Sequence, residues 1–400
     1  MAKIEEVLTR GVEKIYPSRE ALEKVLRSGK KIRLYQGFDP SMPNLHLGHF
    51  VGILKLKQFQ DLGHEVIFLV GDFTGMIGDP ADKSSTRKLL TRKQVLENSK
   101  SWREQAGKVL SFAGKNPAKL MFNSQWGDKI TFRDLIEITS KFTVQQMLER
   151  DFFQRRLKAE KPIHLHEFLY PVAQAIDCIE MDVDLEIGGS DQTFNMLCGR
   201  TLMKALKDKE KFVLTTKLLV DSKGEKVGKT AGNALFLDAS PNDMYGGIMS
   251  FPDEAIIPGF ELLTMVPMTE IKDLGNQMKS GKTNHMGLKK KLAREVVALL
   301  YSEKEAKSAQ EEFERVFQKG KAPIYDILIY DIKGGLKNIV DLLVETKLAP
   351  SRSEAKRLVE QGAVEVDGKP ITNYQLPITI KDGMIIKVGK RKFLKISANQ

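Results

Sequence analysis

The segment from residue 32 to residue 56 constrains the fold more than any other part of the sequence. Residues 32–35 are apolar and β-prone, residues 37–43 include a glycine, an aspartate and two prolines, and apolar residues recur through 51–56. This order predicts a strand, a crossing loop and a helix. The helix would begin beside His46 and His49, and a helix N-terminus with two imidazoles suits an anion. Taken alone, the segment fits equally well a turn with two incidental histidines.

Strand patterns recur along the first half of the chain. Residues 66–70 are fully apolar, residues 181–187 alternate acidic and apolar side chains, and residues 211–220 are also typical of a strand. Fully apolar strands are expected in a parallel sheet that is covered on both faces. We therefore predict an α/β fold with a Rossmann-like parallel sheet, whose ligands bind at the carboxyl ends of the strands.

Two long helical patterns lie outside these strands. Apolar spacing predicts helix over residues 4–28, with a break at Pro17, and a long polar helix over residues 139–156.

Four hundred residues are too many for one compact core and indicate several domains. Helical periodicity dominates after residue 240, and the last 65 residues have a different, mixed α+β pattern. The expected boundaries are a Rossmann-like domain at 1–240, an α-helical domain at 241–325, a linker at 326–335 and a small α+β domain at 336–400.

Charge and cysteine content narrow the class of protein. The formal net charge is +11, and residues 336–400 carry 12 Lys and Arg against 7 Asp and Glu. This balance favours a nucleic-acid partner over a membrane, although a merely soluble basic protein would fit the charge alone. Only Cys178 and Cys198 are present, which argues against a disulfide framework or a cysteine-rich zinc site. With no signal-peptide pattern or membrane-spanning run, we expect a cytoplasmic protein.

Polar residues stand out on a mainly apolar helical segment near the middle of the chain. Tyr170, Gln174 and Asp177 fall on one helix face, where burial is costly unless they meet a polar ligand or one another. A glycine-containing turn at residues 188–195 could receive a sugar or a phosphate. His164 and His166 would point to opposite sides of an extended chain, so we interpret them as structural and predict no metal site.

Two basic loops could hold an anion, but surface loops often have this composition. The first carries Lys83 and Arg87, and the second runs from Lys223 to Thr230. The second loop does not match a nucleotide-binding P-loop, because position 223 would need a glycine.

Several motifs together resemble a known family. The pair His46-Leu-Gly-His49 and Lys226-Val-Gly-Lys229-Thr230 resembles the two motifs of class I aminoacyl-tRNA synthetases. Four further stretches resemble tyrosyl-tRNA synthetases in their order and spacing, at residues 35–40, 78–80, 170–177 and 188–192. The residues at 166–171 and 194–195 resemble those of the second of two bacterial branches of this family. Residues 336–400 resemble an S4-type RNA-binding domain.

The resemblance implies a reaction in which the carboxylate of tyrosine attacks the α-phosphate of ATP. Tyrosyl-adenylate and pyrophosphate form, and tyrosine then passes to the 3′ end of tRNA(Tyr). The implied partners are ATP with Mg²⁺, L-tyrosine, tRNA(Tyr) and a second copy of the chain in a homodimer, with no membrane. Positioning and cations, rather than a covalent nucleophile, would lower the barrier.

The resemblance also implies roles for individual residues. The expected catalytic residues are His46, His49, Lys83, Arg87, Lys226, Lys229 and Thr230. Those expected to contact ATP are Gly37, Asp39, His46, Gly48, His49, Gly189, Asp191 and Lys229. Those expected to bind tyrosine are Tyr35, Asp79, Tyr170, Gln174, Asp177 and Gln192, with Tyr35 and Asp177 at the phenol. Those expected to bind RNA are Arg352, Lys356 and Arg357.

The sequence departs from the family pattern in a few places. The second motif has Val-Gly and Thr230 where Met-Ser and Ser are commoner, and Gly52 stands where the other bacterial branch has a threonine near ATP. Two rival interpretations remain at this point. One is tryptophanyl-tRNA synthetase, which lacks the phenol-directed pair, and the other is a non-catalytic RNA-binding protein on the same scaffold.

Overall fold

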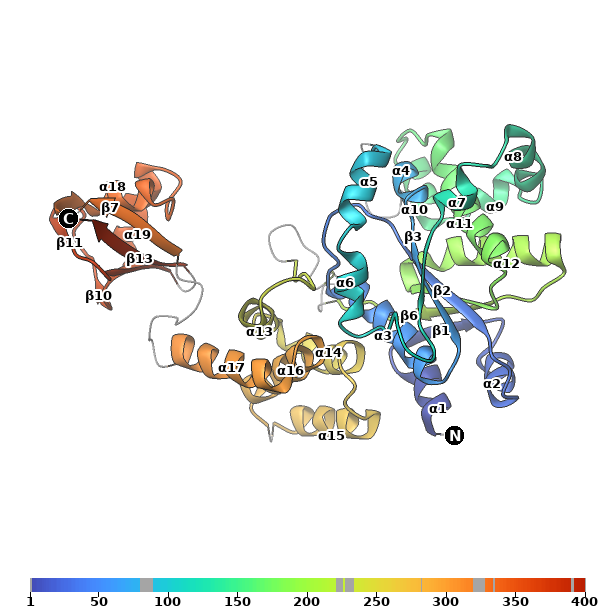
Figure 1. Ribbon diagram of the computed structural model, residues 1–400, viewed down its shortest axis with the longest axis horizontal. Coiled ribbons are helices and arrows are strands. Elements are labelled where there is room, and N and C mark those ends of the chain that lie inside the picture. The colour runs from blue at the N-terminus through green and yellow to red at the C-terminus, as the bar shows by residue number, and fades with distance from the viewer. Residues whose placement is uncertain are drawn as a thin grey trace. The chain divides into compact units, whose positions relative to one another are not determined.

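The chain forms two compact units, Met1–Ala306 and Lys307–Gln400. The computed structural model (Figure 1) describes residues 2–79, 89–220, 226, 234–281, 283–318, 328–333, 335–389 and 392–399. Within these residues, no helix is long and apolar enough to cross a membrane.

A six-stranded sheet forms the centre of the first unit. Its strands are β1 (Val12–Tyr16), β2 (Arg33–Phe38), β3 (Glu65–Val70), β4 (Lys119–Phe122), β5 (Leu185–Gly189) and β6 (Phe212–Thr216). The order is β1-β6-β5-β2-β3-β4. Every neighbouring pair is parallel except β1 with β6. The predicted Rossmann-like parallel sheet is confirmed, and its crossover connections bring the strands' carboxyl ends to one edge.

Helices cover both faces of this sheet. Those that precede residue 210 are α1 (Ala2–Thr9), α2 (Arg19–Arg27), α3 (Leu47–Asp61), α4 (Thr74–Ile77), α5 (Arg92–Ser99), α6 (Trp102–Gly107), α7 (Ser124–Gly127), α8 (Phe132–Thr139), α9 (Val144–Leu148), α10 (Asp151–Lys158), α11 (Leu165–Met181) and α12 (Thr193–Lys207). Tyr35, Ile67 and Leu69 join one core cluster with residues of α11 and α12. Helix α3 contacts both β2 and β3. Because side chains alternate between the faces of a strand, the remaining residues of β2 and β3 point toward α3. Figure 1 shows the sheet among its helices.

Two sequence predictions about helices were wrong. Residues 12–16 form strand β1 instead of continuing a helix, because Gly11 adopts a left-handed φ of +60° and the following residues pair with β6. The long helix predicted over 139–156 is broken into shorter pieces. Thr143 caps α9, and the extended backbone of Arg150 separates α9 from α10.

The predicted helical region after residue 240 is confirmed. It contains α13 (Pro241–Met249), α14 (Ile256–Leu263), α15 (Met268–Lys279), α16 (His285–Leu300) and α17 (Glu303–Phe313), and α17 crosses the boundary between the two units.

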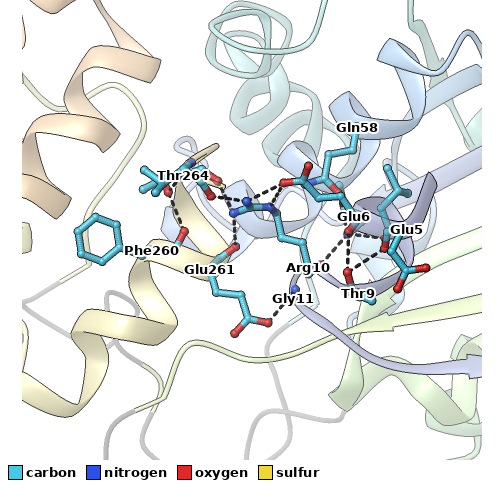
Figure 2. A network of polar contacts seen from close by, with 12 residues as sticks. Glu5, Glu6, Thr9, Arg10, Gly11, Gln58, Phe260, Glu261 and Thr264 are labelled. Atoms are coloured by element: carbon cyan, nitrogen blue, oxygen red, sulfur yellow. Dashed lines mark hydrogen bonds and ion pairs between the residues drawn. The ribbon is translucent and has the colours of Figure 1, made fainter. Parts of the chain in front are cut away.

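Arg10 links the first helix of the chain to this helical region (Figure 2). Its guanidinium donates to the carbonyl of Thr264 at 3.2 Å, to that of Val266, and to the Glu6 carboxylate at 2.7 Å. The backbone N–H of Gly11 donates to Glu261 at 2.9 Å. Carbonyls near the end of α14 have no partner within their helix, so a buried arginine that satisfies them ties α14 to α1.

The second unit has its own core and sheets. Its elements after α17 are β7 (Leu328–Lys333), β8 (Gly335–Asn338), α18 (Ile339–Glu345), α19 (Arg352–Glu360), β9 (Val364–Val366), β10 (Lys369–Pro370), β11 (Pro377–Ile380), β12 (Ile385–Val388) and β13 (Lys392–Asn399). The five-stranded sheet has the order β10-β9-β12-β13-β7, and β11 pairs with β8. Strand β7 lies within 326–335, the stretch expected to be a linker, and its parallel pairing with β13 makes it part of this sheet.

Candidate active site

A cavity opens at the carboxyl ends of β2, β3, β5 and β6, where the sequence predicted it. It brings together most of the residues predicted for ATP and tyrosine, namely Tyr35, Gly37, Asp39, His46, Gly48, His49, Asp79, Tyr170, Gln174, Asp177, Gly189, Asp191, Gln192 and Lys226. Lys83, Arg87, Lys229 and Thr230 lie outside the described residues. Arg352, Lys356 and Arg357 belong to the second unit.

The N-terminus of α3 presents the two predicted histidines to the cavity. His46 is the N-cap residue, and its Nδ1 accepts the backbone N–H of Gly48 at 3.0 Å. The Nδ1 of His49 accepts the backbone N–H of His46 at 3.2 Å, and the two rings stack with centroids 3.8 Å apart. Because each Nδ1 accepts, the hydrogen bonds assign the proton of each neutral ring to Nε2. The positive end of α3 therefore carries two imidazole N–H donors.

Residues 235–237, which are far from α3 in the chain, form backbone hydrogen bonds with the residues at the start of α3. The backbone N–H of Leu47 donates to Leu235 at 3.0 Å, and that of Leu237 donates to Leu45 at 2.8 Å. His46 thereby pairs with Phe236 in a short antiparallel bridge. These contacts join the start of α3 to residues 234–237, which follow the second motif a few residues later in the chain. No sequence pattern indicated this pairing.

Lys226 places a cation at the same end of the cavity. Its Nζ lies 2.9 Å from Oδ2 of Asp191, and both side chains are 30% exposed. Its backbone pairs with Val220 in an isolated bridge. A partly exposed ion pair of this kind contributes little to stability, so Lys226 can exchange its carboxylate partner for a phosphate at low cost.

The opposite end of the cavity is deeply buried and holds Asp177. Trp126 donates its indole N–H to Oδ1 of Asp177 at 2.8 Å, and Asn123 donates its amide to Oδ2 at 3.2 Å. Burial raises the pKa of Asp177 well above its ordinary value, although these two hydrogen bonds act in the opposite direction. The sequence predicted Asp177 but neither partner, because both follow β4, far from α11 in the chain.

Tyr35 lies beside Asp177 in a second buried network. Tyr35 and Glu186 are register partners on the neighbouring strands β2 and β5, and the Tyr35 hydroxyl donates to Oε1 of Glu186 at 2.6 Å. Lys211 forms an ion pair with Oε2 of the same carboxylate. Burial raises the pKa of Tyr35 well above its ordinary value, and Cys178 and Glu186 add to this shift. Sequence reasoning missed Glu186 and Lys211, whose only signal was charge within strand-like runs.

The residues predicted for the ammonium group of tyrosine each take part in a hydrogen bond with a carboxylate oxygen. Tyr170 donates to Oδ2 of Asp39 at 2.8 Å, and Gln174 donates through Nε2 to Glu186 at 2.8 Å. Asp79 accepts from Arg150 at 2.6 Å and from Gln192 at 2.7 Å. Carboxylate oxygens are therefore gathered at this place, and they are the acceptors that an ammonium group with three donors requires.

Gln36 explains why position 52 is a glycine. Neighbouring residues of a strand point to opposite faces, so Tyr35 faces α11 while Gln36 faces α3. A side chain at position 52 would collide with the Gln36 carboxamide. Within the described residues, Oε1 of Gln36 is buried and accepts no hydrogen bond. Gln36 therefore fills the space beside α3 that a side chain at position 52 would otherwise take.

The predicted RNA-binding residues lie on α19 of the second unit. Arg352 forms an ion pair with Asp341, and Arg357 lies 2.7 Å from Glu354. The Lys356 ammonium is 5.5 Å from the centroid of the Tyr374 ring. All three pairings lie at the surface, where competing phosphate groups can replace them.

Comparison with known proteins identifies the class of protein to which the chain belongs. The family described as tRNA synthetases class I (W and Y) matches residues 27–318, and the S4 domain family matches residues 338–383. The chain is 43% identical to the tyrosine–tRNA ligase of Thermotoga maritima, over 98% of this chain and 97% of that protein. It is also 43% identical to that of Dehalococcoides mccartyi, over 98% of both. The chain therefore belongs to the class I synthetases and, within them, to the tyrosine–tRNA ligase family.

Solved structures agree with this assignment. A C-terminally truncated mitochondrial tyrosyl-tRNA synthetase from Coccidioides posadasii has a TM-score of 0.63 and 26% identity, covering 77% of this chain and 91% of that one. A tyrosyl-tRNA synthetase from Archaeoglobus fulgidus, solved with L-tyrosine, shares the fold with a TM-score of 0.59 and 20% identity, covering 77% of this chain and 99% of that one. The family and fold predicted from the motifs are confirmed.

Proposed function

We propose that this chain activates L-tyrosine with ATP to form tyrosyl-adenylate and pyrophosphate, and then transfers tyrosine to the 3′ end of tRNA(Tyr). One observation carries the proposal. Strand β2 and helix α11 place a buried phenol-directed pair at one end of the cavity, and α3 places an anion-directed helix start at the other. A tyrosine bound between Asp177 and Asp79 would direct its carboxylate toward the N-terminus of α3. Membership in the tyrosine–tRNA ligase family supports the same reaction.

The helix start and the basic loops would handle the phosphates. His46 and His49 would donate from Nε2 to phosphate or ribose oxygens of ATP, and Gly37, Gly48 and Gly189 would let the backbone approach the nucleotide. Lys226 would leave Asp191 for the pyrophosphate as negative charge develops there, which frees Asp191 for the ribose. Lys83, Arg87, Lys229 and Thr230 would assist in this step. Mg²⁺ would arrive with ATP, bound mainly by phosphate oxygens and water.

The acceptor groups at the buried end would orient tyrosine. Tyr35 and Asp177 would contact the phenol, Asp79, Tyr170 and Gln174 the ammonium group, and Gln192 the carboxylate. Asp39, whose oxygens accept from Thr74 at 2.7 Å and from Tyr170, would stand near the α-phosphate and hold Tyr170 in place. These groups are arranged before the substrate binds, so little reorganisation is needed at the reaction step.

The remaining regions would bind the tRNA. The helices of residues 241–325 would contact the anticodon arm, and residues 336–400, with Arg352, Lys356 and Arg357, would bind its phosphates. A tRNA substrate fits a cytoplasmic protein. The two cysteines are buried and form no disulfide, which fits the reducing environment of the cytoplasm.

We also propose a homodimer, with a face on α8, α9 and the start of α11. Large apolar side chains are exposed there, including Phe132 at 79% and Leu165 at 84%. Val144 and Ile136 are exposed as well. Such side chains are typical of a surface covered by a partner. Sedimentation of Leu165→Asp should show a shift toward monomer, whereas an unchanged dimer would remove this face from consideration.

Tyrosine-dependent exchange of pyrophosphate into ATP tests the proposed reaction. Exchange should require tyrosine, and tryptophan should not replace it. Exchange with tryptophan alone, or with neither amino acid, would contradict the proposal. Charging of a panel of tRNAs would then identify the nucleic-acid substrate.

A further inference from the structure

Residues 235–239, which follow the second motif a few residues later in the chain, are held by three separate elements. Two backbone hydrogen bonds join this segment to Leu45 and Leu47 at the start of α3. Leu237, in the middle of the segment, is 0% exposed. Any other group that holds residues 235–239 therefore also restrains the start of α3.

Helix α6 holds this segment through Lys108. Lys108 is the C-cap residue of α6, and its Nζ donates to the carbonyl of Leu237 at 2.5 Å. Gln105, one turn earlier, accepts the backbone N–H of Leu45 through Oε1 at 2.7 Å. Residues three apart in a helix are neighbours on its surface, so one side of α6 holds both the loop before α3 and the segment after the second motif.

Tyr301 holds the same segment from the helical region. It is the C-cap residue of α16, and its hydroxyl donates to the carbonyl of Ala239. Burial raises the pKa of Tyr301 to about 12, so the hydroxyl keeps its proton at neutral pH and remains a donor. The Nζ of Lys108 lies 4.0 Å from the centroid of the Tyr301 ring, within the range of a cation–π contact. Burial lowers the pKa of Lys108, and the nearby Asp238 carboxylate offsets part of this shift.

We propose that Lys108 and Tyr301 are positioning residues for the activation step: by holding the carbonyls of Leu237 and Ala239, they fix the segment that follows the second motif against the start of α3. Both residues lie outside the lining of the cavity, so they act through this segment and not on the substrates. This role rests on the proposed function, in which α3 and the second motif bind ATP. It gives the helical region a part in the activation of tyrosine, before any tRNA is bound.

The role affects the activation rate more than tyrosine binding. Catalysis by positioning depends on small displacements of the groups that face the reacting atoms. His46 pairs with Phe236 in the antiparallel bridge, so a displacement of residues 235–239 reaches the N-cap of α3. The groups proposed for tyrosine lie mainly on β2 and α11 and have hydrogen-bond partners of their own. Loss of either bond to the segment should therefore slow activation and leave tyrosine affinity nearly unchanged.

Removing the amine of Lys108 tests the proposal. Lys108→Met keeps an unbranched side chain but donates no hydrogen bond to Leu237. The single-turnover rate of adenylate formation should fall about tenfold, as expected for the loss of one buried hydrogen bond, while the Kd of tyrosine stays nearly unchanged. The control is Lys100→Met, which removes a lysine that is 69% exposed and paired with Glu97, and which should keep the native rate. A native rate in Lys108→Met, or an equal loss of rate and of tyrosine affinity, would overturn the proposal.

Removing the hydroxyl of Tyr301 tests the helical region by itself. Tyr301→Phe keeps the ring beside Lys108 and loses the donor to Ala239. Pyrophosphate exchange without tRNA should fall about threefold. The matched control is Tyr245→Phe, which removes a hydroxyl that donates to the carbonyl of Lys290 at 3.4 Å between α13 and α16 of the same region. Exchange should be native in this control, and an equal loss in both variants would mean that Tyr301 only stabilises the helical region.

Backbone hydrogen exchange separates this inference from the proposed function, because it needs no substrate. The N–H of Leu237 should exchange faster in Lys108→Met than in the native protein, whereas the N–H groups of β3 should exchange as before. Faster exchange throughout the protein would mean general destabilisation and would overturn the proposal. If Lys108→Met does not fold, Tyr301→Phe takes its place in this measurement. Native protein that exchanges pyrophosphate with tyrosine, together with variants that keep its rate, refutes the inference and leaves the proposed function standing.

Discussion

The two ends of the cavity differ in the kind of polar groups they present and in how far these groups are exposed to solvent. At the end formed by the start of α3, the groups are donors and cations, and the Lys226 side chain is 30% exposed. At the other end the groups are oxygen acceptors, each held by a second residue, and Tyr35 and Asp177 are 0% and 4% exposed. Under the proposed function, the comparison teaches that amino-acid selectivity would be preorganised in the interior, whereas phosphate chemistry would rely on side chains that can change partners.

Removing a group from the buried end should have the largest effect. Asp177→Ala leaves Trp126 and Asn123 without their acceptor and would delete the proposed contact with the phenol. We expect the KM for tyrosine in pyrophosphate exchange to rise about 100-fold, with the KM for ATP nearly unchanged. Glu180→Ala, on the exposed side of the same helix, is the control. A native tyrosine KM in Asp177→Ala would mean that this residue does not bind tyrosine.

Removing a cation from the exposed end should change the rate instead of the affinity. Lys226→Met is expected to slow single-turnover adenylate formation about 10- to 100-fold, because charge on the pyrophosphate is less well stabilised. Tyrosine affinity should stay the same. Lys204→Met removes an exposed lysine outside the cavity and should have no effect. An unchanged rate of adenylate formation in Lys226→Met would mean that Lys226 does not take part in catalysis. It would also weaken the contrast between the two ends of the cavity.

Deletion of the S4 domain should spare both ends of the cavity. A chain that stops at Gln318 loses the S4 domain together with β7, which belongs to the same sheet. Charging of tRNA is expected to fall about tenfold or more at physiological salt through lost phosphate contacts, while pyrophosphate exchange is retained. Equal loss of both activities would show that the unit stabilises the first unit instead of binding RNA.

The smallest expected effect is at the boundary between the two ends. Gly52→Thr forces its side chain against Gln36, and such overpacking should destabilise the protein by about 1–3 kcal/mol. Thermal unfolding measures this change, and the KM for ATP should rise with it. The double variant Gln36→Ala/Gly52→Thr removes the collision and should recover most of the stability. Failure to recover it would mean that Gln36 does not occupy the space in question.

Much of the cavity could be predicted because its residues lie in local patterns. His46 and His49 follow a strand and open a helix, and Tyr170 to Asp177 follow the helical repeat, so spacing alone placed them on their elements. The alternation of strands and helices similarly predicted the sheet and its ligand-binding edge. Residues 12–16 show where this logic fails, because pairing with β6, some 200 residues away, overrides a helix-compatible pattern.

The sequence by itself determined the family, the parallel sheet and most of the residues that line the cavity. Only the tertiary structure decided how those groups are held: Trp126 and Asn123 on Asp177, Glu186 and Lys211 behind Tyr35, and Gln36 against Gly52. The reason is that a local repeat specifies which face of a helix or strand a side chain occupies. The direction of a buried hydrogen bond depends instead on a partner from another element, and that partner is known only when the elements have packed together.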